Sequence, residues 1–147
     1  MRITLRSLIA ILSTVIVASC AAKTPPVVAA LDSRWVAILE GPGAAIYLDT
    51  KSSRRIGAGE VQVWLTTQYR ERQRLLGYEY FGELELIDFD CRRRLSRIHQ
   101  STLRDAGGRA VFHSEFPDPA SARYSAVVPG GVTEVKFAAT CDHLRPE

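Results

Sequence analysis

Residues 60–70 read EVQVWLTTQYR, and this stretch decides the fold. Val61, Val63 and Leu65 alternate along it with polar residues such as Gln62. A period of two is the pattern of a β-strand that buries one of its faces and leaves the other against water. The stretch therefore predicts a strand of an antiparallel sheet with one covered face.

Trp64 departs from this alternation, because it falls on the polar face of the predicted strand. Two interpretations are open for it. The tryptophan packs under a helix or a loop that crosses that face, or it is exposed to contact a partner.

The same alternation predicts further strands on both sides of this stretch, separated by turn residues. Within the stretch that follows it, the apolar phase changes between Leu86 and Ile87. One strand cannot serve a single core in both phases, so the change predicts a β-bulge at this point. The expected strands cover residues 35–39, 45–48, 80–91, 93–105 and 109–115, and residues 71–77 are expected to form a charged connection.

The last segment, residues 131–140, is ambiguous. Its apolar residues fit one face of a helix, and Pro129-Gly130-Gly131 with Glu134 resembles a helix start. However, the segment is rich in β-branched residues, which disfavours a helix. Antiparallel β-structure dominates in either case.

The N-terminus has the features of a secretory signal. Arg2 and Arg6 precede an apolar run over residues 8–18, which is shorter than the roughly twenty residues that a membrane-spanning helix needs. Val17-Ala18-Ser19-Cys20 follows, and it resembles the bacterial lipobox. We therefore predict a signal peptide at residues 1–19 and lipidation of Cys20. An ordinary cleaved signal and an uncleaved anchor are the alternatives.

Cleavage before Cys20 would leave a lipidated tether at residues 20–32 and one domain at residues 33–147. By resemblance to known sorting signals, Ala21 after the lipidated cysteine favours the outer membrane. The mature chain loses two arginines with the signal, so 17 basic residues face 16 acidic ones. Such a nearly neutral chain gives no reason to expect nucleic acid as a partner.

Lipidation of Cys20 leaves Cys91 and Cys141 as an even pair in an oxidising compartment. A disulfide between them is the default interpretation, and two buried free thiols are the alternative. Neither cysteine has a second ligand at the spacing of a zinc finger, so we expect no metal site.

No motif of an enzyme is present. The sequence has no glycine-rich phosphate loop and no nucleophile elbow, and its three histidines are far apart. We therefore predict a protein that is not an enzyme and holds no cofactor. Acidic residues line one stretch and are expected on a solvated strand face: Glu83, Glu85, Asp88 and Asp90.

Arginines form two clusters, which raise the question of an anionic ligand. Arginine recognises the phosphates and carboxylates of glycans, lipopolysaccharide and proteins. The alternative is that the arginines pair with the acidic residues of residues 83–90 on a neighbouring strand. The clusters are Arg70, Arg72 and Arg74, then Arg92, Arg93, Arg94 and Arg97; Arg92, Arg93, Arg94 and Trp64 are the candidate binding residues.

The order of these landmarks resembles the surface-adhesin protein E-like family over residues 34–142. No single motif is specific, but the ordered set is. The sequence departs from the family's pattern at two places. The family's Pro-Gly-Ser is Pro-Gly-Gly here, and the aromatic residue often seen before that motif is Tyr124. The landmarks are Trp35, Tyr47-Leu48-Asp49, Ser52-Ser53, Val61-Gln62-Val63-Trp64, Phe89-Asp90-Cys91 and Pro129-Gly130-Gly131.

The resemblance implies an α+β fold, mainly an antiparallel β-sheet with a short C-terminal helix at residues 131–140 and bridged cysteines. The family's namesake resembles a dimeric adhesin of host matrix proteins, serum proteins and haem, so a homodimer and a protein or glycan ligand are expected partners. The expected function is a binding domain on an outer-membrane lipoprotein. The alternative is a periplasm-facing accessory lipoprotein in envelope assembly or maintenance.

Overall fold

The computed structural model describes residues 31–116 and 123–143. Nine elements form there, eight strands followed by one helix. The predicted signal peptide, Cys20 and most of the predicted tether lie outside the described residues. The elements are β1 (Trp35–Glu40), β2 (Ala44–Asp49), β3 (Arg54–Gly57), β4 (Glu60–Leu75), β5 (Tyr78–Asp90), β6 (Leu95–Arg104), β7 (Ala110–Glu115), β8 (Ser125–Ala126) and α1 (Val132–His143).

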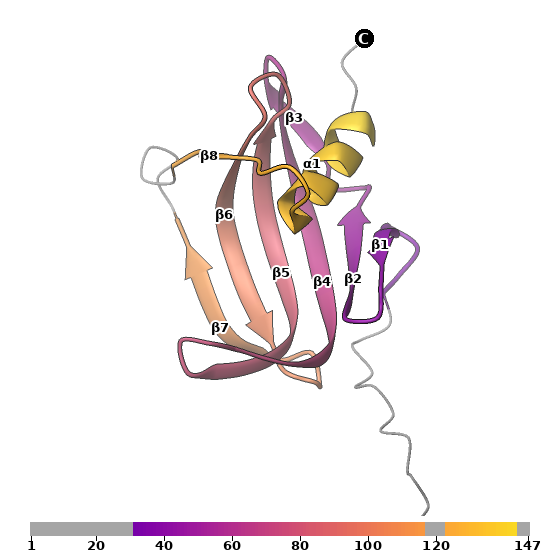
Figure 1. The fold of residues 1–147 in the computed structure, drawn as a ribbon, viewed down its shortest axis with the longest axis vertical. Helices are drawn as coiled ribbons and strands as arrows, with labels where there is room; N and C mark the ends of the chain where they lie inside the picture. Colours follow the sequence, from indigo (N-terminus) through magenta and orange to yellow (C-terminus); the bar gives the residue numbers. More distant parts are fainter. Residues whose placement is uncertain (1–30, 117–122, 144–147) are drawn as a thin grey trace, which may run out of the picture.

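The strands form one antiparallel sheet in the order β1-β2-β4-β5-β6-β7 (Figure 1). β3 continues the edge of β4 beyond β2, and β8 pairs with the start of β6. The predicted α+β class, a mainly antiparallel sheet with a short C-terminal helix, is confirmed. No helix of the described residues is long and apolar enough to cross a bilayer.

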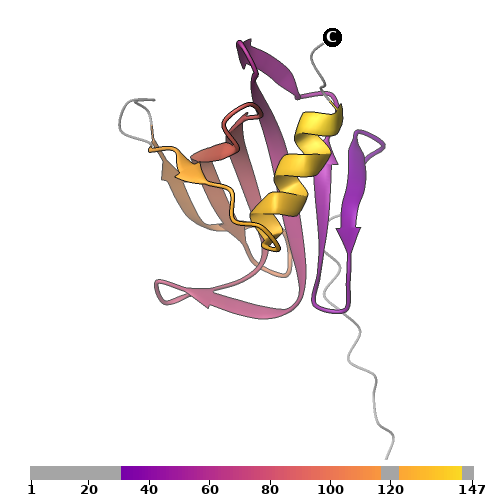
Figure 2. The same ribbon diagram turned by 45° about the horizontal axis from the view of Figure 1, so that its top comes forward.

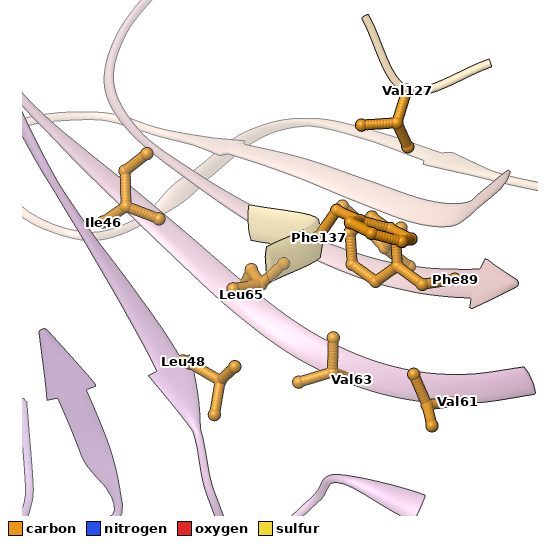
Figure 3. Packing of buried hydrophobic residues seen from close by; sticks show 9 residues of the cluster. Ile46, Leu48, Val61, Val63, Leu65, Phe89, Val127 and Phe137 are labelled. Carbon is orange, nitrogen blue, oxygen red and sulfur yellow. The ribbon is translucent and has the colours of Figure 1, made fainter. Parts of the chain in front are cut away.

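The core lies between the sheet and α1, which crosses one face (Figure 2). Phe137 of α1 packs edge-on against Phe89 of β5, with ring centroids 5.8 Å apart. Val61, Val63 and Leu65 lie in this core, as their alternation predicted (Figure 3). Burial of these apolar side chains against the helix is the main force that holds the two layers together.

A disulfide joins Cys91, directly after β5, to Cys141 in α1. The two Cα atoms lie 5.8 Å apart, within the range that a disulfide requires. The predicted pairing is confirmed, and free thiols are excluded. Because both sulfurs border the core, the link fastens the helix over the sheet.

A bulge lies opposite the predicted position between Leu86 and Ile87, but its extra residue belongs to the neighbouring strand β6 and not to β5. The register between β5 and β6 shifts between Leu86 and Ile87, and the extra residue is His99 of β6. β5 itself pairs regularly with β4 through this point. The phase change therefore has another cause, which is that β5 carries apolar residues on both faces.

The boundaries of other elements differ from the predictions. Residues 71–77 do not form the predicted charged connection between strands, because β4 continues to Leu75 and β5 begins at Tyr78. β6 begins at Leu95 rather than at residue 93. The helix begins at Val132 and ends at His143, three residues beyond the predicted end at residue 140. β3 and β8 were not predicted, since they are short and lack an alternating pattern.

We predict that replacing both Cys91 and Cys141 by Ala lowers the free energy of unfolding by about 4 kcal/mol, because the disulfide closes a loop of about fifty residues. Urea unfolding followed by circular dichroism measures the loss. Reductant should destabilise the wild type similarly and leave the double variant unchanged. Equal midpoints for the oxidised wild type and the variant would contradict this.

Candidate binding face

Trp64 lies on the face of the sheet opposite α1. It stands directly across from Leu86, whereas its neighbour Val63 stands across from Ile87 in the core. Side chains directly opposite each other on antiparallel strands share a face. The register therefore excludes α1 as the cover of Trp64, which is half-buried on the helix-free face.

Other aromatic side chains share this helix-free face. Tyr47 of β2 pairs with Thr66, the next residue of β4 on the same side as Trp64. Trp35 of β1 pairs with Asp49, which lies two residues beyond Tyr47 and therefore on the same side. Both tryptophans of the chain thus lie on the face without a helix. All three aromatic side chains are half-buried rather than sealed.

A buried carboxylate, Asp88, organises the polar part of the same face. Its side chain is inaccessible to water and accepts a hydrogen bond from Gln62 Nε2 at 2.9 Å. Arg97 Nη2 donates to its other oxygen at 2.6 Å, and His99 Nε2 lies 2.6 Å from that oxygen. Arg54 in turn donates two hydrogen bonds to Gln62 Oε1. The carboxylate is thereby fully satisfied, as burial of a charge requires.

Tyr124 extends this network towards β8. The guanidinium carbon of Arg97 lies 4.5 Å from the centre of the Tyr124 ring, within cation–π range. Burial raises the pKa of the Tyr124 hydroxyl, although the charge of Arg97 acts in the opposite direction. Arg97 is thus held between a carboxylate and a ring, which makes it part of the framework of this face.

The predicted binding residues Arg92, Arg93 and Arg94 lie in the turn between β5 and β6. Arg93 Nε donates to Asp90 at 2.5 Å, and its Nη2 lies 3.7 Å from Glu60. The buried position of Asp90 acts to raise its pKa, but hydrogen bonds from the backbone and side chain of Arg93 outweigh this and lower the pKa.

Arg94 instead joins the turn to the helix. Its Nη2 lies 2.6 Å from Glu134 Oε1, and its guanidinium lies over the ring of Phe137. The stem of Arg92 packs so closely on Gly59 that a Cβ atom there would lie 2.8 Å from Arg92 Cγ. The three arginines are neighbours in the sequence, but their side chains contact different elements. Their predicted role in binding stays a prediction.

The acidic residues of β5 do not form a solvated face, so that expectation is wrong. Glu85 and Asp90 are each 4 % exposed, and Asp88 is fully buried. The strand alternates, so Glu85 points to the helix, where it pairs with Lys136. Burial raises the pKa of Glu85, and the Lys136 ammonium opposes the shift.

The predicted pairing of arginines with acids on a neighbouring strand is confirmed for Arg97 and Asp88, whereas Arg93 pairs with Asp90 within the turn that follows β5. It is wrong for the first cluster, because Arg72 and Arg74 both pair with Glu79. Sequence reasoning missed Gln62, Arg54 and His99 as members of the network. Only the strand register, which sets Gln62 opposite Asp88, would have identified them.

A groove of about 510 Å³ opens near the start of α1, and Arg97 is among the residues that line it. Ile98, Phe116 and Arg123 also line it. Among the described residues, no three His, Cys, Asp or Glu side chains gather in a way that could hold a metal ion.

We predict that Asp88→Asn lowers the free energy of unfolding by about 3 kcal/mol, because it leaves the guanidinium of Arg97 buried without its counter-charge. Urea unfolding measures this. The matched control is Asp105→Asn, which weakens a largely exposed pair with Arg109 and should cost less than about 1 kcal/mol. Equal losses for the two variants would refute the role given to Asp88.

Comparison with known proteins agrees with the fold and with the order of its landmarks. The model of one family, described as surface-adhesin protein E, matches residues 35–142, from the first residue of β1 to the last turn of α1. No curated protein and no solved structure matches the chain. Because the match covers most of the sequence, the chain belongs to the surface-adhesin protein E family.

Proposed function

We propose that this protein is an outer-membrane lipoprotein, anchored through Cys20, whose domain binds a host protein or glycan by its helix-free face. Membership of the surface-adhesin protein E family supports a non-enzymatic role at the cell surface. The observation that carries the proposal is the position of Trp35 and Trp64 on the one face that α1 leaves open.

Several properties of that face suit a binding surface. Tryptophan and tyrosine combine a large apolar area with a polar group, and they are enriched among the residues that dominate binding energy. Here they lie beside the polar network of Asp88, which fixes Gln62 and Arg97 in place. A rigid surface loses little conformational entropy when a partner binds.

The outer edge of β1 supports the further proposal of a homodimer. Among the described strands β1 pairs only with β2, and Val36 and Leu39 are 49 % and 38 % exposed. Unprotected edge strands pair readily with a second chain. The mass of the mature domain from sedimentation equilibrium tests this, and a purely monomeric mass at high concentration would exclude the dimer.

We predict that Trp64→Ala weakens binding of the mature domain to immobilised basement-membrane extract or whole serum by about tenfold or more, as loss of a central aromatic contact does. Surface plasmon resonance measures this. Phe116→Ala is the control, because Phe116 is 44 % exposed but lines the groove near α1. If Phe116→Ala weakens binding about tenfold and Trp64→Ala leaves binding unchanged, the helix-free face is not the binding surface.

We predict that protease added to intact cells removes the domain, and that Cys20→Ser abolishes labelling with a fatty acid and releases the protein from the membrane. Immunoblots of shaved cells and of membrane fractions check both points. A domain that is protected until the outer membrane is breached would instead support the periplasm-facing accessory lipoprotein. Unchanged membrane attachment of Cys20→Ser would contradict the anchor.

A further inference from the structure

The hairpin between β4 and β5 continues past the residues that pair with β2 and β6. β4 pairs with β2 only as far as Tyr69, and β5 pairs with β6 only from Gly82 onward. Residues 70–81 are here called the hairpin arm, and among the described strands their only ladder pairs join residues 73–75 to residues 78–80. At the base of the arm the backbone N–H of Arg70 still donates to Gly43 O. Figures 1 and 2 show the arm bending sideways from the end of β4 and running below the ends of β6 and β7.

The turn at the end of the arm holds a leucine in an unfavourable conformation. Leu76 and Gly77 have φ angles of 52° and 85°, as the central residues of a two-residue hairpin turn of type I′ require. Glycine adopts a positive φ without strain, but leucine does not. Leu76 is also 75 % exposed, so its side chain gains little from folding. Neither the strain nor the exposure benefits the isolated domain.

Leu76 is the centre of an exposed apolar tip. Leu75 before it is 46 % exposed, and Tyr78 after the turn is 42 % exposed. The Tyr78 ring packs against Phe112 of β7 at 5.2 Å between centroids, which braces the arm against the sheet. Contiguous exposed apolar side chains of this kind mark a contact with a partner or a membrane.

Arginines lie directly behind the apolar tip. Arg72 Nη1 and Arg74 Nη2 lie 2.9 Å and 2.6 Å from the two carboxylate oxygens of Glu79. Their side chains are 55 % and 72 % exposed, so both guanidiniums remain open to further anionic groups. Hydrogen bonds from Arg72 and then Arg74 lower the pKa of Glu79, which keeps this arrangement charged in mildly acidic conditions.

An apolar tip with an aromatic ring and arginines behind it is the arrangement of elements that lie at a bilayer interface. The apolar side chains enter the boundary between headgroups and acyl chains, and guanidiniums contact the lipid phosphates. Tyrosine favours the headgroup level because one end of it is apolar and the other polar. The arm has these parts in that order from its end inwards.

We propose that the hairpin arm docks on an anionic phospholipid bilayer, with Leu75, Leu76 and Tyr78 in the interface and Arg72 and Arg74 at the phosphates. A bilayer is favoured over a protein partner because of the lipid proposed on Cys20, so this inference rests on the proposed anchor. The chain between Cys20 and Trp35 reaches at most about 45 Å when fully extended. A tether of that reach keeps the arm at a high effective concentration near lipid.

The test uses the mature chain with Cys20→Ser, which carries no lipid, in co-sedimentation with vesicles of phosphatidylethanolamine and phosphatidylglycerol or of phosphatidylcholine alone. We expect binding that is stronger to the anionic vesicles. Leu76→Asn should reduce the bound fraction about tenfold. It should also keep the fold, because asparagine tolerates the positive φ better than leucine.

Val128→Asn is the matched control. Val128 is 66 % exposed but lies between β8 and α1, outside the arm, so this variant should bind vesicles as the wild type does. Sedimentation no greater than without vesicles, or equal binding by Leu76→Asn and the wild type, would overturn the proposal. Equal binding to both kinds of vesicle would overturn the preference for an anionic bilayer that the charges of Arg72 and Arg74 are proposed to supply.

Retention of the chain by delipidated outer-membrane proteins, without vesicle binding, would assign the arm to a protein partner and also overturn the proposal. Because the tested chain is not acylated, its vesicle binding is independent of the proposed anchor. Failure of Cys20 labelling would therefore refute the anchor alone, and failure of sedimentation would refute the membrane role of the arm alone.

Discussion

The link between Cys91 and Cys141 holds a single helix against a single face of the sheet, and the rest of the structure follows from this one-sided cover. A helix of twelve residues cannot cover a sheet of this width. The apolar core is therefore concentrated under α1, where Phe89 and Phe137 meet. A domain with so limited a core depends on a covalent link to keep its two layers together.

The opposite face has to be stable without such a cover. It is held by a polar network in which Gln62, Arg97 and His99 all contact the buried carboxylate of Asp88. Hydrogen bonds are directional, so a network of this kind fixes side chains more strictly than apolar contact does. The stability of this face is therefore sensitive to substitution, because loss of one member leaves another charged group buried and unpaired.

Much of the fold was predictable because it depends on local patterns. The period of two in residues 60–70 identified the central strand, and the cysteine count identified the disulfide. The binding face was less predictable, because it depends on register. Whether Asp88 faces water or Gln62 is decided by the pairing of β4 with β5, and a single sequence does not contain that pairing. The same holds for Glu85, whose partner Lys136 is fifty-one residues away.

The distribution of aromatic residues has a spectroscopic consequence. Both tryptophans lie on the helix-free face, whereas the buried rings of the core, Phe89 and Phe137, belong to phenylalanine. Light at wavelengths absorbed by indole alone therefore excites that face and not the core. The emission of the native protein would respond to whatever approaches Trp35 and Trp64, while motions within the core would pass unrecorded. The chain thus carries its own fluorescent reporter at the surface where we place its ligand.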